Sequence, residues 1–285
     1  MRQLVTKLIL LLAILLAIKL PFGMREPDPL DSKWSALAAA DYNTVFVGSS
    51  RTQYDVDASG FDRATAGRTR SFNLGVATAL PPETFAWCHE IITRDGRLKY
   101  LFVELSGVTQ DLEMDMLRPR AYRASNYPWW LRTMPIRRWS EYHDHLFVSL
   151  LRPALLLGRH IEPPPDPSKL LAAFERNRAL EMPDGPPYEA RHEQYQSEMN
   201  DLIALAESRG VTLYFFPPPR LETDHEMETI YPVYRRIDPK YLIDGGHDAP
   251  DINTLETSMD DYHLNPAGAA LYTARLAAAF NDRTR

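Results

Sequence analysis

The stretch VFVGSSRTQYDVD, residues 45–57, joins a short apolar run to a polar segment. Its β-branched and aromatic residues are typical of a fully buried strand, and the strand ends at Gly48. Two serines follow at once. A serine at this place is either a nucleophile presented by the strand or the N-cap of a helix that begins there. Both roles stay open for Ser50, because Ser49 would cap a helix equally well.

Strands and helices alternate on both sides of this stretch. Further strands are predicted at residues 69–77, 99–107, 211–219 and 240–246. Helices are predicted at residues 81–96, 188–210 and 265–280, with Gly210 ending the second helix and Asn265 capping the third. This alternation predicts an α/β fold of three layers, in which helices cover both faces of a mainly parallel sheet. Such sheets bind ligands beyond the carboxyl ends of their strands, where Ser50 is expected to lie.

The composition limits the class of protein. The chain has 285 residues, 45% of them hydrophobic, which is enough for one large α/β domain or two small ones. A net charge of -6 gives no reason to expect a nucleic acid as partner. Cys88 is the only cysteine, so the chain has no internal disulfide, and the apolar sequence around Cys88 predicts a buried side chain.

Residues 1–23 are typical of a segment that targets a membrane. Arg2 and Lys7 precede an unbroken apolar run, residues 8–18. A cleaved signal peptide also needs a small-residue cleavage site, and no A-x-A pattern follows here. We therefore expect an uncleaved signal anchor rather than a cleaved signal or a buried core helix. On this interpretation residues 24–285 form the exported, periplasmic domain of a single-pass protein of the inner membrane.

Residues 107–187 interrupt the alternation and are expected to form a helical insertion. Within them, residues 116–140 contain six arginines, three tryptophans, two tyrosines and no acidic residue. Three interpretations are open. The insertion is a surface that contacts the membrane or a membrane partner, a site at which Trp129, Trp130 and the arginines bind a polysaccharide, or a helical segment that packs its own aromatic rings.

A nucleophilic serine needs a histidine as base and a carboxylate that orients this histidine. Of the eight histidines, His263 has the most informative context, SMDDYHLNPAGAALY, directly before the last predicted helix. A histidine at that place would face the same edge of the sheet as Ser50. Asp260 precedes it by three residues, a spacing at which the carboxylate reaches the imidazole, and Asp261 is the rival for this role.

Metal sites are not expected. His and Asp occur together at residues 143–145 and again at residues 244–251. Neither group has the ligand spacing of a structural or catalytic metal site, so both are interpreted as solvated loops. We expect the protein to use no metal and no cofactor.

The sequence around Ser50 and His263 resembles the SGNH (GDSL-like) hydrolase superfamily over residues 45–106 and 211–280. Gly48, Ser49 and Ser50 stand where the superfamily has its G-D-S block, and Asp260 and His263 match its D-x-x-H block. The resemblance implies the flavodoxin-like fold of that superfamily. It also implies that Ser50 is the nucleophile and that the N–H groups of Ser50 and Gly75 bind the oxyanion.

At the third block, this chain departs from the pattern of the superfamily. The superfamily has an asparagine there that helps to bind the oxyanion, whereas this chain has VELSGVTQD after the third strand. Ser106 is the candidate replacement. Loss of one oxyanion donor typically costs about 100- to 1,000-fold in rate, so the departure favours a slow hydrolase, a transferase supplied with activated acyl groups, or a degenerate member.

The nearest resemblance is to the exported, membrane-anchored DltD-like branch, which also lacks a clear third block. Members work with membrane-bound O-acyltransferases to place acyl groups on envelope polymers, and related proteins act in alginate and peptidoglycan O-acetylation. The resemblance therefore implies transfer of an acyl group, acetyl being the expected one, through Ser50 to a polysaccharide. Arg51, directly after Ser50, either binds an anionic acceptor or pairs with an acidic residue, and both roles stay open. An esterase or deacetylase and a non-catalytic scaffold for a membrane acyltransferase are the alternatives.

Overall fold

The computed structural model describes residues 29–77, 79, 81–94, 96–105, 189–219, 235–247, 249–252, 254–260 and 262–285, together with residues 6, 7 and 10. The statements that follow concern this part of the chain. The predicted insertion at residues 107–187 and nearly all of the predicted anchor at residues 1–23 lie outside it.

A four-stranded parallel sheet forms the centre of the fold. The strands are β1 (Thr44–Gly48), β2 (Ser71–Gly75), β3 (Tyr100–Glu104) and β4 (Thr212–Phe216). They lie in the order β2-β1-β3-β4, and every neighbouring pair is parallel. The predicted α/β class and parallel sheet are confirmed, and the carboxyl ends of all four strands meet at one edge.

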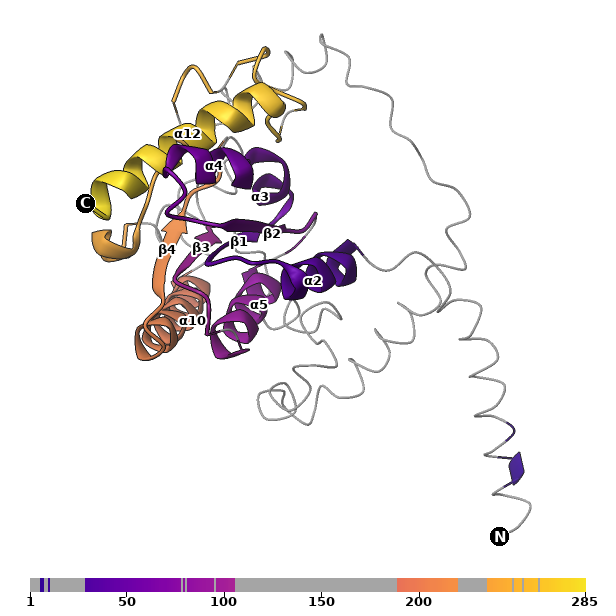
Figure 1. Cartoon of the computed structure of the whole chain (residues 1–285). Coiled ribbons are helices and arrows are strands. Elements are labelled where there is room, and N and C mark those ends of the chain that lie inside the picture. Colours follow the sequence, from indigo (N-terminus) through magenta and orange to yellow (C-terminus); the bar gives the residue numbers. More distant parts are fainter. Residues whose placement is uncertain are drawn as a thin grey trace.

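Helices cover both faces of the sheet (Figure 1). One face carries α2 (Pro29–Ala39), α5 (Pro81–Arg94) and α10 (Glu189–Ser208). The other face carries α3 (Ser50–Asp55), α4 (Ala58–Ala64) and α12 (Pro266–Arg283). Alternate residues of β1 point into the two layers: Val45 and Val47 belong to the core cluster that contains Trp87 of α5, while Phe46 belongs to the cluster that contains Phe280 of α12.

The two ends predicted from turn and cap residues agree with the structure. Gly210 follows α10 with a φ of 68°, a left-handed conformation that suits glycine. Asn265 caps α12, since its side chain accepts the N–H groups of Ala267 and Gly268. Cys88 is fully buried, as expected, and burial raises the pKa of its thiol.

The strand predicted at residues 240–246 is wrong. A short 3-10 helix, η3 (Pro239–Tyr241), occupies its first part, with Asp238 as N-cap. Leu242 then makes a single parallel bridge to Phe215 of β4. Only two residues are left between the 3-10 helix and the turn that begins at Asp244, so a fifth strand cannot form.

No helix among the described residues is long and apolar enough to cross a membrane. This finding concerns those residues only.

Candidate active site

Two glycines on neighbouring strands form the floor of the site. Gly48 ends β1 and pairs with Gly75 at the end of β2. A Cβ on Gly75 would lie 2.2 Å from the backbone N of Gln53, and a Cβ on Gly48 would lie 2.0 Å from Thr52 Oγ1. Because glycine has no Cβ, α3 can lie directly on the carboxyl ends of β1 and β2.

Ser49, not Ser50, is the N-cap of α3. The Ser49 backbone is extended, and its hydroxyl accepts the N–H of Arg51 at 3.2 Å. Ser50 is the first residue of the helix, so its own hydroxyl is not needed to cap it. The two roles that the sequence leaves open for this pair are therefore divided between them.

His263 lies on a tight turn in front of α12. The N–H of Met259 donates to the His263 carbonyl at 2.9 Å and closes the turn. Inside it, Asp260 Oδ1 accepts the N–H of Tyr262 at 2.8 Å and the N–H of His263 at 2.7 Å. The D-x-x-H spacing thus forms an Asp-centred turn that returns the carboxylate to the imidazole.

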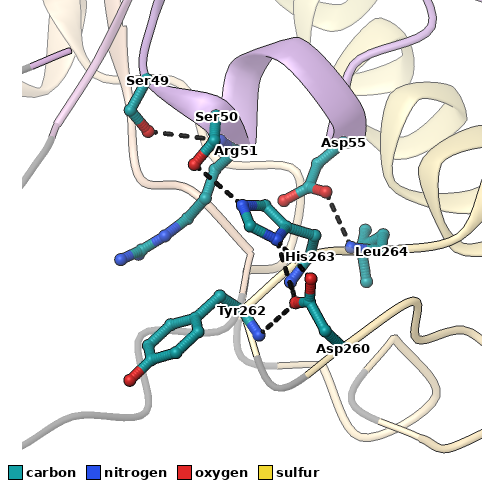
Figure 2. A network of polar contacts seen from close by, with 8 residues as sticks. All are labelled: Ser49, Ser50, Arg51, Asp55, Asp260, Tyr262, His263 and Leu264. Carbon is teal, nitrogen blue, oxygen red and sulfur yellow. Dashed lines mark hydrogen bonds and ion pairs between the residues drawn. The ribbon is translucent and has the colours of Figure 1, made fainter. Parts of the chain in front are cut away.

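Figure 2 shows Ser50, His263 and Asp260 in one line of contacts. His263 Nε2 lies 2.8 Å from Ser50 Oγ, and His263 Nδ1 lies 2.9 and 2.8 Å from the two Asp260 oxygens. The carboxylate can only accept, so it favours the tautomer with the proton on Nδ1 and leaves Nε2 to accept the Ser50 O–H. The structure therefore brings together the three predicted residues in the order that activates a serine.

The surroundings of Asp260 favour its charged form. Burial alone would raise the pKa of this carboxyl group. The hydrogen bond from the His263 ring, the N–H of Tyr262, the charge of His263 and the His263 N–H together outweigh burial and lower the pKa of Asp260. A negative Asp260 can stabilise the positive charge that His263 gains when it takes the serine proton.

Two more residues of α3 hold the histidine turn. Asp55 is fully buried, and its Oδ1 accepts the N–H of Leu264 at 2.7 Å, as Figure 2 shows. The Tyr54 ring packs edge-on against His263, with centroids 5.2 Å apart. One short helix therefore carries the candidate nucleophile, Ser50, and also positions its base.

Glu104, the last residue of β3, is a site residue that the sequence analysis missed. Its side chain is 1% exposed. It accepts the Ser49 N–H at 2.9 Å, the Ser49 hydroxyl at 2.6 Å, the Thr52 N–H at 3.0 Å and the Thr52 hydroxyl. An acidic residue that directly ends an apolar strand, as in YLFVE, is the signal that would have indicated it.

The predicted oxyanion donors have different surroundings. Within the described part of the chain, the N–H of Ser50 has no acceptor. The N–H of Gly75 donates to Asn73 Oδ1 at 2.8 Å, so it would have to exchange this partner to bind an oxyanion. Ser106 lies outside the described residues.

The predicted substrate-binding residues are divided in the same way. The Arg51 side chain is buried, with 9% of the residue exposed, and Figure 2 shows it extending from α3 away from His263. Arg51 is therefore a buried residue next to Ser50 in the chain, with a side chain that does not extend toward the candidate base. Trp129 and Trp130 lie outside the described residues, as does Asp261, the rival orienting residue.

Two exposed aromatic residues lie beside His263. From residue 29 onward, the large apolar side chains that are exposed among those the structure describes are Tyr54, Leu255, Met259 and Tyr262. Tyr54 is 44% exposed and Tyr262 is 42% exposed, and both flank His263. Exposed aromatic rings beside a candidate base are typical of a surface that binds an organic ligand or a partner.

A second D-x-x-H turn, Asp244–His247, repeats this local geometry. Asp244 Oδ1 accepts the N–H groups of Gly246 at 2.7 Å and His247 at 3.1 Å, and Asp244 Oδ2 lies 2.9 Å from His247 Nδ1. Burial alone would raise the pKa of Asp244, but the bonds and charge of His247 and the Gly246 N–H lower it. No group of three or more potential metal ligands occurs among the described residues.

A comparison with models of protein families finds no match, and a comparison with curated proteins finds no similar chain.

Proposed function

We propose that this chain is a serine-dependent O-acyltransferase of the SGNH (GDSL-like) type, in the DltD-like branch. The observation that carries the proposal is the contact of 2.8 Å between Ser50 Oγ and His263 Nε2, two residues 213 positions apart. Asp260 supports this contact from the other side of the imidazole ring. A parallel sheet that presents Ser50 at its carboxyl edge also agrees with that superfamily.

In the first step, Ser50 Oγ attacks the carbonyl carbon of an acyl donor while its proton passes to His263 Nε2. The carbonyl oxygen becomes an oxyanion, for which the N–H of Ser50 is the first donor, with Gly75 and Ser106 as the further predicted donors. The bond to the leaving group then breaks, and the leaving group takes the proton from His263. The acyl group remains on Ser50 as an ester.

In the second step, a hydroxyl of the acceptor attacks this ester and gives its proton to His263. The bond to Ser50 Oγ breaks, and the oxygen recovers the proton from His263. The product is an ester of the acceptor, and the enzyme returns to its starting state. Asp260, whose pKa is lowered, stays negative and stabilises the imidazolium in both steps.

A polysaccharide of the cell envelope is the proposed acceptor, and a membrane-bound O-acyltransferase is the proposed supplier of an activated acyl group. The exposed rings of Tyr54 and Tyr262 beside His263 suit the apolar faces of sugar rings. Arg51 gives the site a positive charge for an anionic acceptor. The N-terminal signal anchor would hold the domain on the outer side of the inner membrane, near the acyl supplier.

Hydrolysis is the second candidate, because Ser50 is partly exposed and water can therefore reach it. An esterase or deacetylase would use the same first step and pass the acyl group to water.

The test uses the full-length chain in detergent, exposed to an activated acetyl ester and analysed by intact mass. A mass increase of one acetyl group on the wild type and none on Ser50→Ala is expected. Discharge of the adduct by added polysaccharide, much faster than by buffer, supports the transferase. Discharge to free acetate at one rate with or without polysaccharide supports the esterase. No adduct and no ester consumption in either protein would contradict a serine mechanism for this donor.

A further inference from the structure

Glu104 fills a space that only glycine at position 48 can leave open. Phe102 and Glu104 face the same side of the sheet as Phe46 and Gly48, since the Phe46 and Phe102 rings stack with centroids 4.5 Å apart. One row further along the strands, a Cβ on Gly48 would lie 2.3 Å from Glu104 Oε2. The missing side chain lets the carboxylate of Glu104 lie directly under α3.

The carboxylate holds the turn on both sides of Ser50. Ser49 precedes the candidate nucleophile, and its N–H and its hydroxyl both donate hydrogen bonds to the Glu104 carboxylate. Thr52 follows it and also gives an N–H and a hydroxyl. The Ser49 hydroxyl also accepts the N–H of Arg51, so Ser49 links the Glu104 carboxylate to the first turn of α3.

The chemistry of these contacts makes the turn and the acid depend on each other. A carboxylate has only acceptor sites, and this one meets four donors from Ser49 and Thr52. If the turn moved, a buried carboxylate would lose the hydrogen bonds that compensate its burial, which is costly. The turn is therefore fixed in the one conformation that keeps Glu104 satisfied.

We infer that Glu104 is a positioning residue for the reaction at Ser50. It acts through the turn Ser49–Thr52, which sets the position of Ser50 Oγ relative to His263 Nε2. As far as it concerns the reaction, the inference rests on the proposed acyl transfer. A misplacement of about 1 Å in an active site can cost on the order of 100-fold in rate.

The first test measures how fast Ser50 reacts with a small fluorophosphonate probe. Full-length wild type, Glu104→Gln and Glu90→Gln are compared by intact mass, and each rate constant is normalised to the protein labelled at completion. Glu90 is a matched control, because it is also buried but lies on α5 and pairs with Arg94 at 3.0 Å. Glu104→Gln should react about 10- to 100-fold more slowly than wild type, and Glu90→Gln at the wild-type rate.

The second measurement does not depend on any reaction. The ring nitrogens of His263 are observed by NMR in protein with ¹⁵N-labelled histidine, and Ser50→Ala gives the spectrum without the serine contact. The Nε2 resonance of Glu104→Gln should move toward that of Ser50→Ala, while that of Glu90→Gln should not. A purely structural role would lower the melting temperature but leave both the normalised rate and this resonance unchanged.

Wild-type values of rate and resonance in folded Glu104→Gln would overturn the inference. If no protein reacts with the probe, the proposed function fails, and the His263 resonance alone decides the role of Glu104. If Glu104→Gln does not fold, Thr52→Val is measured instead, since it removes one hydroxyl contact and keeps the carboxylate. It should show a smaller change in the same direction, and no change would equally overturn the inference.

Discussion

Ser49 and Ser50 are neighbours in the chain but differ in what their hydroxyl groups contact. The Ser49 hydroxyl caps α3 and donates to Glu104, a residue that is buried below the turn. The Ser50 hydroxyl reaches His263, on a turn at the far end of the chain. A difference of one position in the helix therefore separates a structural serine from the candidate nucleophile. The partners that give each serine its role are far away in the sequence, so the residues around the two serines do not predict them.

Asp260 and Asp244 offer a matched pair for testing the orienting carboxylate. Each aspartate belongs to its own D-x-x-H turn of the same kind, but only the histidine paired with Asp260 contacts Ser50. Asp260→Asn should lose the preference for a proton on Nδ1 and reduce ester turnover by roughly 10⁴-fold. Asp244→Asn should keep the turnover of the wild type. Equal losses in both variants, measured with an activated acetyl ester, would contradict the assignment of Asp260.

Both turns should make the folded state sensitive to acid. The pKa values of Asp244 and Asp260 are lowered in the folded protein, below about 3.9 for an unfolded chain. Their stabilisation is therefore complete above about pH 5 and is lost as the pH falls through the folded-state values. The free energy of unfolding should fall more steeply below pH 5 for wild type than for the double variant Asp244→Asn/Asp260→Asn. Denaturant titrations at a series of pH values measure this. The same dependence of the free energy of unfolding on pH in both proteins would contradict the linkage.

Gly48 should tolerate no side chain. A Cβ there would meet Glu104 Oε2 and Thr52 Oγ1 at 2.3 and 2.0 Å, so Gly48→Ala must displace the turn that carries Ser50. We expect a loss of about 1–3 kcal/mol in the free energy of unfolding and a large loss of ester turnover. Gly96→Ala is the control, because among the described residues no atom beyond its chain neighbours lies within 4 Å of its added Cβ, and it should stay within about 0.5 kcal/mol of wild type. A Gly48→Ala protein as stable and active as wild type would show that the turn is not tightly held.

Among the elements, α12 links the stability of the fold to the histidine turn. Asn265 caps this helix through its Oδ1, and its Nδ2 donates to the carbonyls of Glu256 and Ser258. Asn265→Ala loses both sets of bonds and should cost about 1–2 kcal/mol as well as turnover. Asn265→Asp keeps the cap but not the donors, so it should recover much of the stability and less of the turnover. Denaturant titration measures the loss of the cap, and ester assays measure the effect on turnover. Full recovery of turnover in Asn265→Asp would contradict a role of the Asn265 Nδ2 hydrogen bonds in positioning the histidine turn.

The elements that the sequence predicted well have clear local signals. β1 is a run of buried β-branched and aromatic residues, α10 ends at a glycine, and α12 begins with Asn265 and a proline. Helices α3 and α4 have six and seven residues, too few for a helical period to be visible, and they were not predicted as separate elements. The false strand at residues 240–246 has an apolar core of strand-like composition, but its first two residues belong to the 3-10 helix Pro239–Tyr241, which Asp238 caps.

At the scale of the whole molecule, the site is assembled from distant parts of the chain. The sheet order β2-β1-β3-β4 places the ends of β1, β2 and β3 side by side, and α12 brings the histidine turn above them (Figure 1). The D-x-x-H spacing occurs twice, at Asp244–His247 and at Asp260–His263, and the second pair was chosen because it stands directly before the last predicted helix. Glu104 and Asp55 contact residues that are far away in the sequence, so their partners could not be predicted from local spacing, although the acid at the end of YLFVE marked Glu104 as unusual.

The central claim is that one hydroxyl of the turn Ser49–Thr52 forms an acyl ester. The most direct measurement treats the full-length protein with an activated acetyl ester, stops the reaction with acid, and locates the acetyl group by fragmenting the peptide that contains residues 49–52. The other two hydroxyls within residues 49–52, those of Ser49 and Thr52, are internal controls, because both contact Glu104. We expect an acetyl group on Ser50 in the wild type and none after the change His263→Ala. An acetyl group on Ser49 or Thr52, or labelling of Ser50 that does not depend on His263, would contradict it.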